Sequence, residues 1–547
     1  MNKLEWICPE GRMRDLCEKY FGPGDVRDVQ SRKIGGGYIG GKALGMLLAR
    51  RMLQKNAPVA LQRRIEPHIS FYIGTDVYED WQERGEKFSP LQKGELERAL
   101  ERLGEGPIIV RSSSILEDNF GNAFAGKYES VFLANSGPAH ERARAFIEAA
   151  AAVYRSCRSE EARRYRENRG LQNADEKMAL LAQRVSGSER GGLFYPDVAG
   201  VGYSTNLYVW ERGIDPAAGM LRLVCGLGTR AVDRVPGDFA RVVSLHDPAR
   251  RPIAPEDEAK YAQRRADVIN LATRRLEDRP VSELDLANFP GWERLLTKTA
   301  ELPSVMRTVL TGLAAAYDYP VDIEFTVNFN AAGGFTVNLL QCRPLETMKS
   351  AAGAEAPEAP SNPLGGSEPL LSCNGGFMGG NTRRGIDKVI YVPAKAYLAL
   401  PERDKYQVAR VIGALNTCLR GQKVLLIGPG RWGSTTPSLG VPAHFSELCH
   451  MTALAEVSYS EGGFAPELSF GSHFFADLVE SGMFYAAVYP EREETVFAPD
   501  MITSRENLLL SLLPDSAALA EVIHVASTEG LVFYANMLSQ KLLVFFS

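Results

Sequence analysis

The chain has 547 residues, which is too long for a single hydrophobic core and predicts two to four domains. Apolar residues make up 45% of the chain and charged residues 24%, a composition typical of soluble globular proteins. The net charge of −5 provides no basic field, so the composition argues against a nucleic-acid partner.

The start of the chain and its cysteines indicate a cytoplasmic protein. The opening residues include Glu5 and Glu10 and contain no apolar core of a signal peptide. No run of 18 apolar residues predicts a membrane span. The eight cysteines are scattered without a CxxC pair, which favours reduced thiols and argues against a zinc site.

A glycine-rich loop leads into a helix within residues 31–53, SRKIGGGYIGGKALGMLLARRML. An apolar stripe at helical spacing predicts the helix, and Lys42 stands where the loop meets it. A lysine at a helix N-terminus favours anions through its charge, the free backbone N–H groups and the helix dipole. The alternative is a solvated lysine on a loop. The stretch does not match G-x-x-x-x-G-K-[ST], so a P-loop is excluded.

Residues 107–132, PIIVRSSSILEDNFGNAFAGKYESVF, are the stretch around which the chain is organised. A short apolar run predicts a buried strand that delivers Arg111 to three serines and two acids. A segment bracketed by Gly121 and Gly126 then precedes a returning strand. Arginine is the bidentate partner of phosphate, and glycine lets backbone N–H groups approach its oxygens. These features predict a polyphosphate site; the alternative is a surface hairpin with turn residues.

The middle of the chain is less informative. Residues 139–169 are rich in arginine and glutamate and predict a helix with a solvated face. Residues 177–185, KMALLAQRV, predict a strand with Gln183 near its end, where an amide can face an adenine edge or simply close the strand. Strands are expected in residues 191–206, and an amphipathic, charged helix in residues 255–275.

A second informative stretch is residues 321–345, VDIEFTVNFNAAGGFTVNLLQCRPL, which predicts a hairpin around a Gly-Gly turn. Asp322 and Glu324 are two residues apart, so both carboxylates project from one face of their strand. Gln341 and Arg343 share a face of the returning strand for the same reason. Such a set can hold Mg²⁺ and a terminal phosphate. The alternative is a cross-strand salt bridge such as Glu324–Arg343.

Residues 347–369 are rich in Ala, Pro, Gly and Ser and predict a linker, beyond which residues 370–547 form a separate region. Residues 423–433 formally match the dinucleotide fingerprint G-x-G-x-x-G, but the residues that follow predict a loop where the fingerprint needs a helix. A Rossmann site is therefore excluded. Strands are expected in residues 483–489 and 531–546. His473 lies among aromatic residues, and we favour a structural role for it over a reactive one.

Four segments stand in one order: IGGKALGM, IIVRSSSILEDNFGNAFAGKYES, MALLAQRVSGSERGGLFY and VDIEFTV…LLQCRPL. Together they resemble the nucleotide-binding portion of phosphoenolpyruvate synthase and pyruvate phosphate dikinase over residues 30–346. The resemblance implies an α+β fold of the ATP-grasp type, in which two lobes clasp ATP. A smaller α/β domain of unassigned fold is expected after it, in residues 370–547.

The same resemblance implies roles for particular residues. Lys42 and Arg111 would hold phosphates, and Gln183 would lie at the adenine hinge. Arg343 would stabilise the transferring phosphoryl group, so Lys42, Arg111 and Arg343 are the catalytic candidates. The Mg²⁺ candidates are Asp322, Glu324 and Gln341. The nucleotide-binding candidates also include Gly121, Gly126 and Ser130.

The family's full-length enzymes carry further parts that this sequence does not show. Their phospho-accepting histidine lies in a Gly-Gly-x-Thr-Ser-His type motif, and their pyruvate site in a large barrel. Residues 370–547 instead resemble the C-terminal part of shorter proteins of the same kind, whose role is unassigned.

We therefore expect a cytoplasmic, Mg²⁺- and ATP-dependent phosphotransferase whose acceptor is an unidentified small molecule or separate protein. The alternatives are a non-catalytic ATP-binding regulatory module and an ATP-grasp ligase that uses an acyl phosphate. The sequence does not decide which phosphate, β or γ, is transferred. It does not decide the oligomeric state either.

Overall fold

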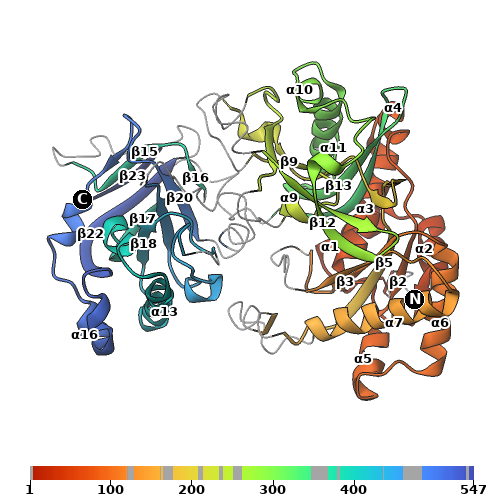
Figure 1. Ribbon diagram of the computed structural model, residues 1–547, viewed down its shortest axis with the longest axis horizontal. Helices are drawn as coiled ribbons and strands as arrows, with labels where there is room; N and C mark the ends of the chain where they lie inside the picture. Colours follow the sequence, from red (N-terminus) through yellow and green to blue (C-terminus); the bar gives the residue numbers. More distant parts are fainter. Residues whose placement is uncertain are drawn as a thin grey trace. The chain divides into compact units, whose positions relative to one another are not determined.

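In this computed structural model the described residues form four β-sheets (Figure 1). The structure describes residues 4–5, 7–118, 120, 128–159, 162–163, 176–206, 214–232, 238–250, 262–345, 368–378, 382–434, 437–459, 478, 483–536 and 541–546. The chain divides into two units. Unit 1 comprises Met1–Leu207 and Asp215–Glu346, and unit 2 comprises Tyr208–Ile214 and Thr347–Ser547.

The first sheet of unit 1 carries the strand that contains Arg111. Its order is β1-β2-β5-β3-β4, and β3 runs antiparallel to both of its neighbours. The bounds are β1 (Lys33–Ile34), β2 (Ser70–Ile73), β5 (Met178–Arg184), β3 (Ile108–Ser114) and β4 (Ser130–Leu133). The strands expected around Arg111 and Gln183 are therefore confirmed.

Three helices pack on the apolar residues of the first sheet: α5 (Thr75–Glu83), α6 (Pro90–Leu103) and α7 (Ala139–Ser156). The expectation of a merely solvated helix over residues 139–169 was wrong for α7. Phe146, Val153 and Tyr154 are fully buried in the core with the strand residues. The charged residues occupy only the other side of an amphipathic helix.

Helix α3 (Gly41–Asn56) begins as expected directly after the glycine loop. At Gly40, φ is 78°, and a Cβ atom would lie 1.4 Å from the backbone oxygen of Ser113. Glycine is needed there because the loop passes against the strand-end backbone. The apolar stripe of α3 is mostly buried in the largest core of unit 1. This packing holds the start of α3, and with it Lys42, beside the end of β3.

The second sheet of unit 1 is antiparallel throughout, with the order β10-β9-β8-β13-β14. Its bounds are β10 (Arg241–Ser244), β9 (Met220–Cys225), β8 (Val198–Tyr203), β13 (Val321–Phe329) and β14 (Phe335–Pro344). Helix α11 (Glu301–Tyr317) shares a core with β13 and β14. The expected hairpin over residues 321–345 is confirmed.

A third sheet, β12-β11-β7-β6, corrects one expectation. Its bounds are β6 (Ser188–Arg190), β7 (Leu193–Tyr195), β11 (Arg265–Asn270) and β12 (Arg275–Pro280). The charges of residues 255–275 suggested a helix, but residues 265–270 form a strand that pairs with β12 and β7. Ala266, Val268 and Ile269 are buried, and pairing on both sides fixes the extended conformation.

Unit 2 is built on one nine-stranded sheet (Figure 1, teal to blue). Its order is β16-β20-β19-β18-β17-β22-β23-β15-β21, and the run from β17 to β20 is parallel. The bounds are β15 (Leu371–Asn374), β16 (Phe377–Met378), β17 (Thr382–Tyr391), β18 (Val424–Pro429), β19 (Ala453–Val457), β20 (Phe484–Val488), β21 (Val496–Phe497), β22 (His524–Asn536) and β23 (Lys541–Phe546).

Several expectations concern unit 2 and the segment before it. Residues 430–434 after β18 are not helical, which confirms that the glycine pattern is no dinucleotide fingerprint. The strands expected in residues 483–489 and 531–546 are present. Most of the expected linker, up to residue 367, lies outside the described residues, and so does His473.

The remaining helices are short or peripheral. They are α1 (Arg12–Tyr20), α2 (Pro23–Ser31), α4 (Val59–Gln62), α9 (Thr229–Val232), α10 (Trp292–Leu295), α12 (Ala394–Leu398), α13 (Glu402–Cys418), α15 (Asp500–Thr503) and α16 (Leu509–Leu512). Within the described parts of the chain, none of the helices combines the length and apolar character that crossing a membrane would require. All eight cysteines are free of disulfide bonds.

Candidate nucleotide site

Arg111 joins the two main sheets of unit 1. Its Nη2 atom donates to Glu324 Oε2 at 2.6 Å and to Gln341 Oε1 at 2.8 Å. Glu324 and Gln341 face each other across the β13–β14 hairpin. Strand β3 of the first sheet therefore places one guanidinium nitrogen on both a carboxylate and an amide of the second sheet.

The next pair along the hairpin is Asp322 with Arg343. The Nε atom of Arg343 donates to both carboxylate oxygens of Asp322, at 2.8 and 2.9 Å. The sequence left open a Glu324–Arg343 salt bridge, but the strand register opposes Asp322 to Arg343 and Glu324 to Gln341. All four side chains project from one face of the hairpin, as their spacing predicted.

Lys42 lies at the end of β3, held by an acid that follows the strand. Its Nζ atom donates to Glu117 Oε1 at 2.8 Å and to Ser112 Oγ at 3.2 Å. The other oxygen of Glu117 accepts from the backbone N–H of Ser114 at 2.8 Å. Glu117 thus ties the ammonium group of α3 to the serine-rich strand end.

Asp118 connects these groups to the hairpin. Its Oδ2 atom accepts from Gln341 Nε2 at 2.7 Å, and its Oδ1 atom lies 3.8 Å from Arg343 Nη1. Only 1% of Asp118 is exposed. The phosphate and metal candidates therefore lie in one network. Within it the adjacent residues Glu117 and Asp118, in the turn after β3, link the contacts of Lys42 to those of the hairpin.

Burial and charge oppose each other in this network. Burial raises the pKa of Asp118 to about 7, against the lowering effects of Arg343 and Lys42. For Glu324, burial also favours the neutral acid, but the nearby Arg111, Arg343 and Lys42 hold its pKa below the ordinary value. Glu324 is therefore a carboxylate at neutral pH.

The oxygen atoms present fit a magnesium ion. Glu324, Asp322 and Gln341 offer carboxylate and amide oxygens, the donors that Mg²⁺ prefers. Asp118 Oδ1 is buried and has no hydrogen-bond partner among the described residues. Within those residues no group of three or more His, Cys, Asp or Glu side chains forms a metal cluster. A magnesium ion here would share its coordination with phosphate oxygens and water, as is usual for this metal.

The other candidates have different surroundings. Ser130 on β4 is the register partner of Arg111 and is exposed. Gln183 is buried, and its Nε2 atom lies 2.9 Å from Met46 Sδ and 3.3 Å from Ser70 Oγ. The register places Gln183 on the same face of the first sheet as Arg111. Gly121 and Gly126 lie outside the described residues.

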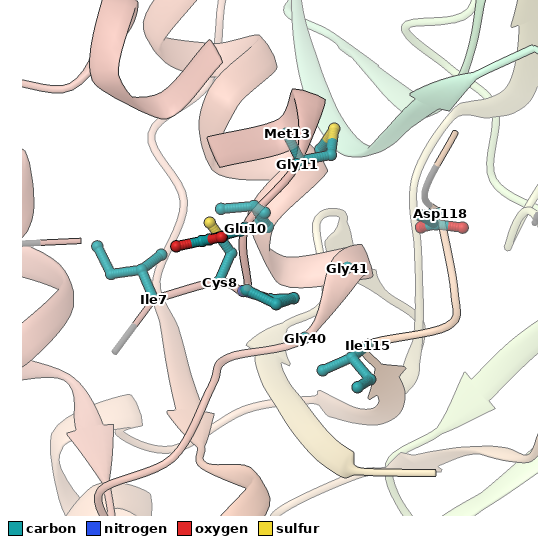
Figure 2. Close-up of a pocket in the computed structure, with 11 residues that line it drawn as sticks. Ile7, Cys8, Glu10, Gly11, Met13, Gly40, Gly41, Ile115 and Asp118 are labelled. Atoms are coloured by element: carbon teal, nitrogen blue, oxygen red, sulfur yellow. The ribbon is translucent and has the colours of Figure 1, made fainter. Parts of the chain in front are cut away.

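A small pocket borders the network at the start of α3. Residues from the N-terminal segment, the glycine loop and the turn after β3 line it. Figure 2 shows Ile7, Cys8 and Glu10 on one side of Gly40 and Gly41, and Asp118 on the other. The N-terminal segment is also tied to the loop by a hydrogen bond from Ile39 N–H to the Ile7 oxygen, at 3.2 Å. The N-terminal segment therefore lies against the glycine loop that precedes Lys42.

Sequence reasoning did not assign roles to Glu117, Asp118 or Arg222. The two acids were visible after the serines, but only the fold brings them to Lys42 and Gln341. Arg222 lies on β9, opposite Val201 of β8, which is in turn opposite Glu324. It is only 4% exposed. In the sequence, Arg222 is distinguished as the one charged residue inside the apolar strand MLRLVC.

A known domain family matches part of this chain. The AMP/ATP-binding domain of pyruvate phosphate dikinase matches residues 84–362, just over half of the chain. The match includes Arg111 and the β13–β14 hairpin, whereas Lys42 precedes it. No curated protein matches the chain.

Among solved structures, D-alanyl-alanine synthetase A from Vibrio cholerae is similar with 12% identity and a TM-score of 0.19. The match covers 59% of this chain and 64% of that one, so this chain spans less than two thirds of the synthetase. This TM-score does not indicate a shared fold. The domain match confirms the expected family and its ATP-grasp-like α+β fold. The chain belongs to the family of the pyruvate phosphate dikinase AMP/ATP-binding domain.

Proposed function

We propose that this protein is a Mg²⁺- and ATP-dependent phosphotransferase of the phosphoenolpyruvate synthase and pyruvate phosphate dikinase type, acting on an unidentified acceptor. The observation that carries this proposal is the contact of Arg111 with both Glu324 and Gln341. A residue type that binds phosphate, on the first sheet, meets two residue types that bind Mg²⁺, on the second sheet. That arrangement suits a bound Mg²⁺–polyphosphate better than it suits a surface salt bridge.

The three catalytic candidates are cations, and each forms an ion pair with a carboxylate. Lys42 binds Glu117, Arg111 binds Glu324, and Arg343 binds Asp322. Phosphate oxygens are equivalent acceptors for charge-assisted hydrogen bonds, so a polyphosphate can replace or share these contacts. Lys42 and Arg111 would hold the phosphates, and Arg343 would stabilise charge on the transferring group.

The hairpin would hold the metal. Glu324 and Gln341 present oxygens beside Arg111, and Asp322 lies one register pair away. When bound, Mg²⁺ neutralises charge on the phosphate oxygens. The lowered pKa of Glu324 keeps its carboxylate ionised for this role at neutral pH.

Gln183 and Ser130 would contact the rest of the nucleotide. The Oε1 atom of Gln183 is buried and has no hydrogen-bond partner among the described residues. It is therefore an acceptor available to the amino group of adenine. Gly121 and Gly126 would supply backbone contacts to phosphate in the segment before β4.

We further propose residues 1–346 as the nucleotide-binding region, 347–369 as a linker and 370–547 as a separate domain. The phosphoryl acceptor is a diffusible molecule or another chain, and His473 does not form a stable phosphohistidine. The free thiols fit a cytoplasmic setting for the reaction.

The test is incubation of the full chain with β- or γ-labelled ATP and Mg²⁺, with and without pyruvate. We expect label to leave ATP only when Mg²⁺ is present, and the formation of AMP or ADP identifies the transferred group. If the chain binds ATP but does not convert it with any acceptor tested, a regulatory module would be favoured instead. Turnover that requires a carboxylic acid and an amine would favour a ligase. Acid-labile label retained on the protein and lost in His473→Ala would refute the external acceptor.

A further inference from the structure

Asp118 occupies an unusual position between the strand end and the hairpin. Its backbone φ is 54°, in the left-handed region, which few residues other than glycine, asparagine and aspartate adopt. It is also almost completely buried, with 1% exposure. Such conformations persist where the surroundings dictate them, and they concentrate at functional sites.

The contacts of Asp118 involve both functional side chains of β14. Oδ2 accepts from Gln341 Nε2 at 2.7 Å, and Oδ1 lies 3.8 Å from Arg343 Nη1. Glu117, the preceding residue, is directed to Lys42 instead. The two neighbouring acids therefore serve different partners, one on α3 and one on β14.

The amide of Gln341 is polarised from both ends. Its oxygen accepts from Arg111 at 2.8 Å, while its nitrogen donates to Asp118. An ionised carboxylate only accepts hydrogen bonds, and a guanidinium only donates them. If the amide were reversed, its N–H₂ would face the guanidinium and its oxygen would face the carboxylate. Neither contact would then be a hydrogen bond.

We infer that Asp118 is a positioning residue that fixes the side-chain oxygen of Gln341 toward the metal and phosphate end of the site. This inference rests on the proposed function, because a metal ion needs the amide oxygen and not the amide nitrogen. Asp118 acts through Gln341 and Arg343 rather than on the nucleotide itself. Partners that orient a metal ligand commonly change metal affinity 10- to 100-fold when removed.

The experiment measures how much Mg²⁺ strengthens nucleotide binding. Calorimetry of the full chain with the non-hydrolysable analogue AMPPNP gives one Kd in EDTA and one in saturating MgCl₂. Their ratio is the metal gain. Thermal unfolding of every variant confirms that it is folded.

Two variants suit the left-handed backbone and so separate side-chain chemistry from strain. Asp118→Gly removes the carboxylate. Asp118→Asn keeps the shape of the side chain but allows the amide of Gln341 to adopt the reversed orientation. We expect both to reduce the metal gain about tenfold while the Kd in EDTA stays nearly unchanged. Asp318→Asn is the matched control, since Asp318 also has a left-handed backbone (φ 48°) and a long Arg contact, yet is exposed. It should retain the full gain.

A double-mutant cycle with Gln341→Ala completes the test. Because Asp118 acts through Gln341, Asp118→Gly should have little further effect on the metal gain in the Gln341→Ala background. An unchanged gain in Asp118→Gly would overturn the inference. So would equal losses with and without Mg²⁺, or additive effects in the cycle. If the unmodified chain does not bind AMPPNP at all, the proposed function fails, and this inference fails with it.

Discussion

Arg111 Nη2 and Glu324 Oε2 lie 2.6 Å apart although 213 residues separate them in the chain. One belongs to β3 of the first sheet and the other to β13 of the second. The phosphate and metal candidates are therefore in direct contact, and a change at either residue also alters the surroundings of the other.

Replacing Arg111 tests the phosphate end of the site. We expect Arg111→Ala to weaken binding of MgATP by about 1.5–3 kcal/mol, which is roughly 10- to 150-fold in Kd, because a charge-assisted contact is lost. Arg111→Lys should restore only part of this affinity, since an ammonium group lacks the planar fork. Titration calorimetry provides the measurement. Arg184→Ala is the matched control, an exposed arginine at the end of β5 in the same sheet. Unchanged affinity in Arg111→Ala would contradict the assignment.

Replacing Glu324 tests the metal end. Glu324→Gln removes a charge that the lowered pKa maintains at neutral pH. Turnover of ATP should fall about 100-fold, the order expected when metal-assisted charge stabilisation is impaired, whereas binding of ATP in EDTA should persist. Glu277→Gln makes the same chemical change on β12, where Glu277 pairs with Arg279, and should leave turnover unaffected. Equal activity of the two variants would exclude Glu324 as a metal ligand.

Part of this site could be predicted from the sequence because it depends on local rules. Apolar runs, glycine turns and the alternation of side chains predict the strand that contains Arg111. They also predict a hairpin with two acidic residues at i, i+2 spacing on one strand, and an amide and a guanidinium at the same spacing on the other. The register then pairs Asp322 with Arg343 and Glu324 with Gln341. No long-range information was needed to place these four on one face.

The contacts between segments could not be predicted in the same way. Asp118 and Gln341 are 223 residues apart, and only the packing of α3 and the two sheets brings them together. The strand at residues 265–270 was misjudged for a related reason. Its charges resemble those of a solvated helix, and pairing with β7 and β12 overrides that local pattern.

Two helical glycines provide opposite predictions for stability. A Cβ atom on Gly45 of α3 would lie 2.1 Å from the backbone oxygen of Cys342, between Gln341 and Arg343. Gly45→Ala should therefore destabilise unit 1 by roughly 1–3 kcal/mol and also weaken ATP binding. Gly312 of α11 has nothing within 4 Å of the same position. Gly312→Ala should stabilise the protein by about 0.5–1 kcal/mol, since alanine restricts the unfolded chain. Scanning calorimetry that shows both variants shifted in one direction would refute this account of the α3–β14 contact.

The last prediction concerns the pH dependence of stability at His68. Burial, with Arg50 and Arg32 nearby, lowers the pKa of His68 to about 3, and its Nδ1 atom shares a hydrogen bond of 2.9 Å with Ser70 Oγ. Between pH 6.5 and pH 3 the unfolded chain binds a proton at this residue and the folded chain does not. The contribution of His68 to the free energy of unfolding is therefore fully present above pH 6.5. It falls as the pH is lowered, by up to about 1.4 kcal/mol per pH unit.

His68→Gln keeps a hydrogen-bonding group near Ser70 but removes the titration. We expect its free energy of unfolding to fall less between pH 7.5 and pH 5 than that of the unmodified chain, by about 1–2 kcal/mol. Urea unfolding at the two pH values gives this difference directly, and other titrating groups cancel in the comparison. His140→Gln, an exposed histidine at the start of α7, should behave like the unmodified chain. Identical pH dependence in His68→Gln and the unmodified chain would show that His68 is protonated in the folded state.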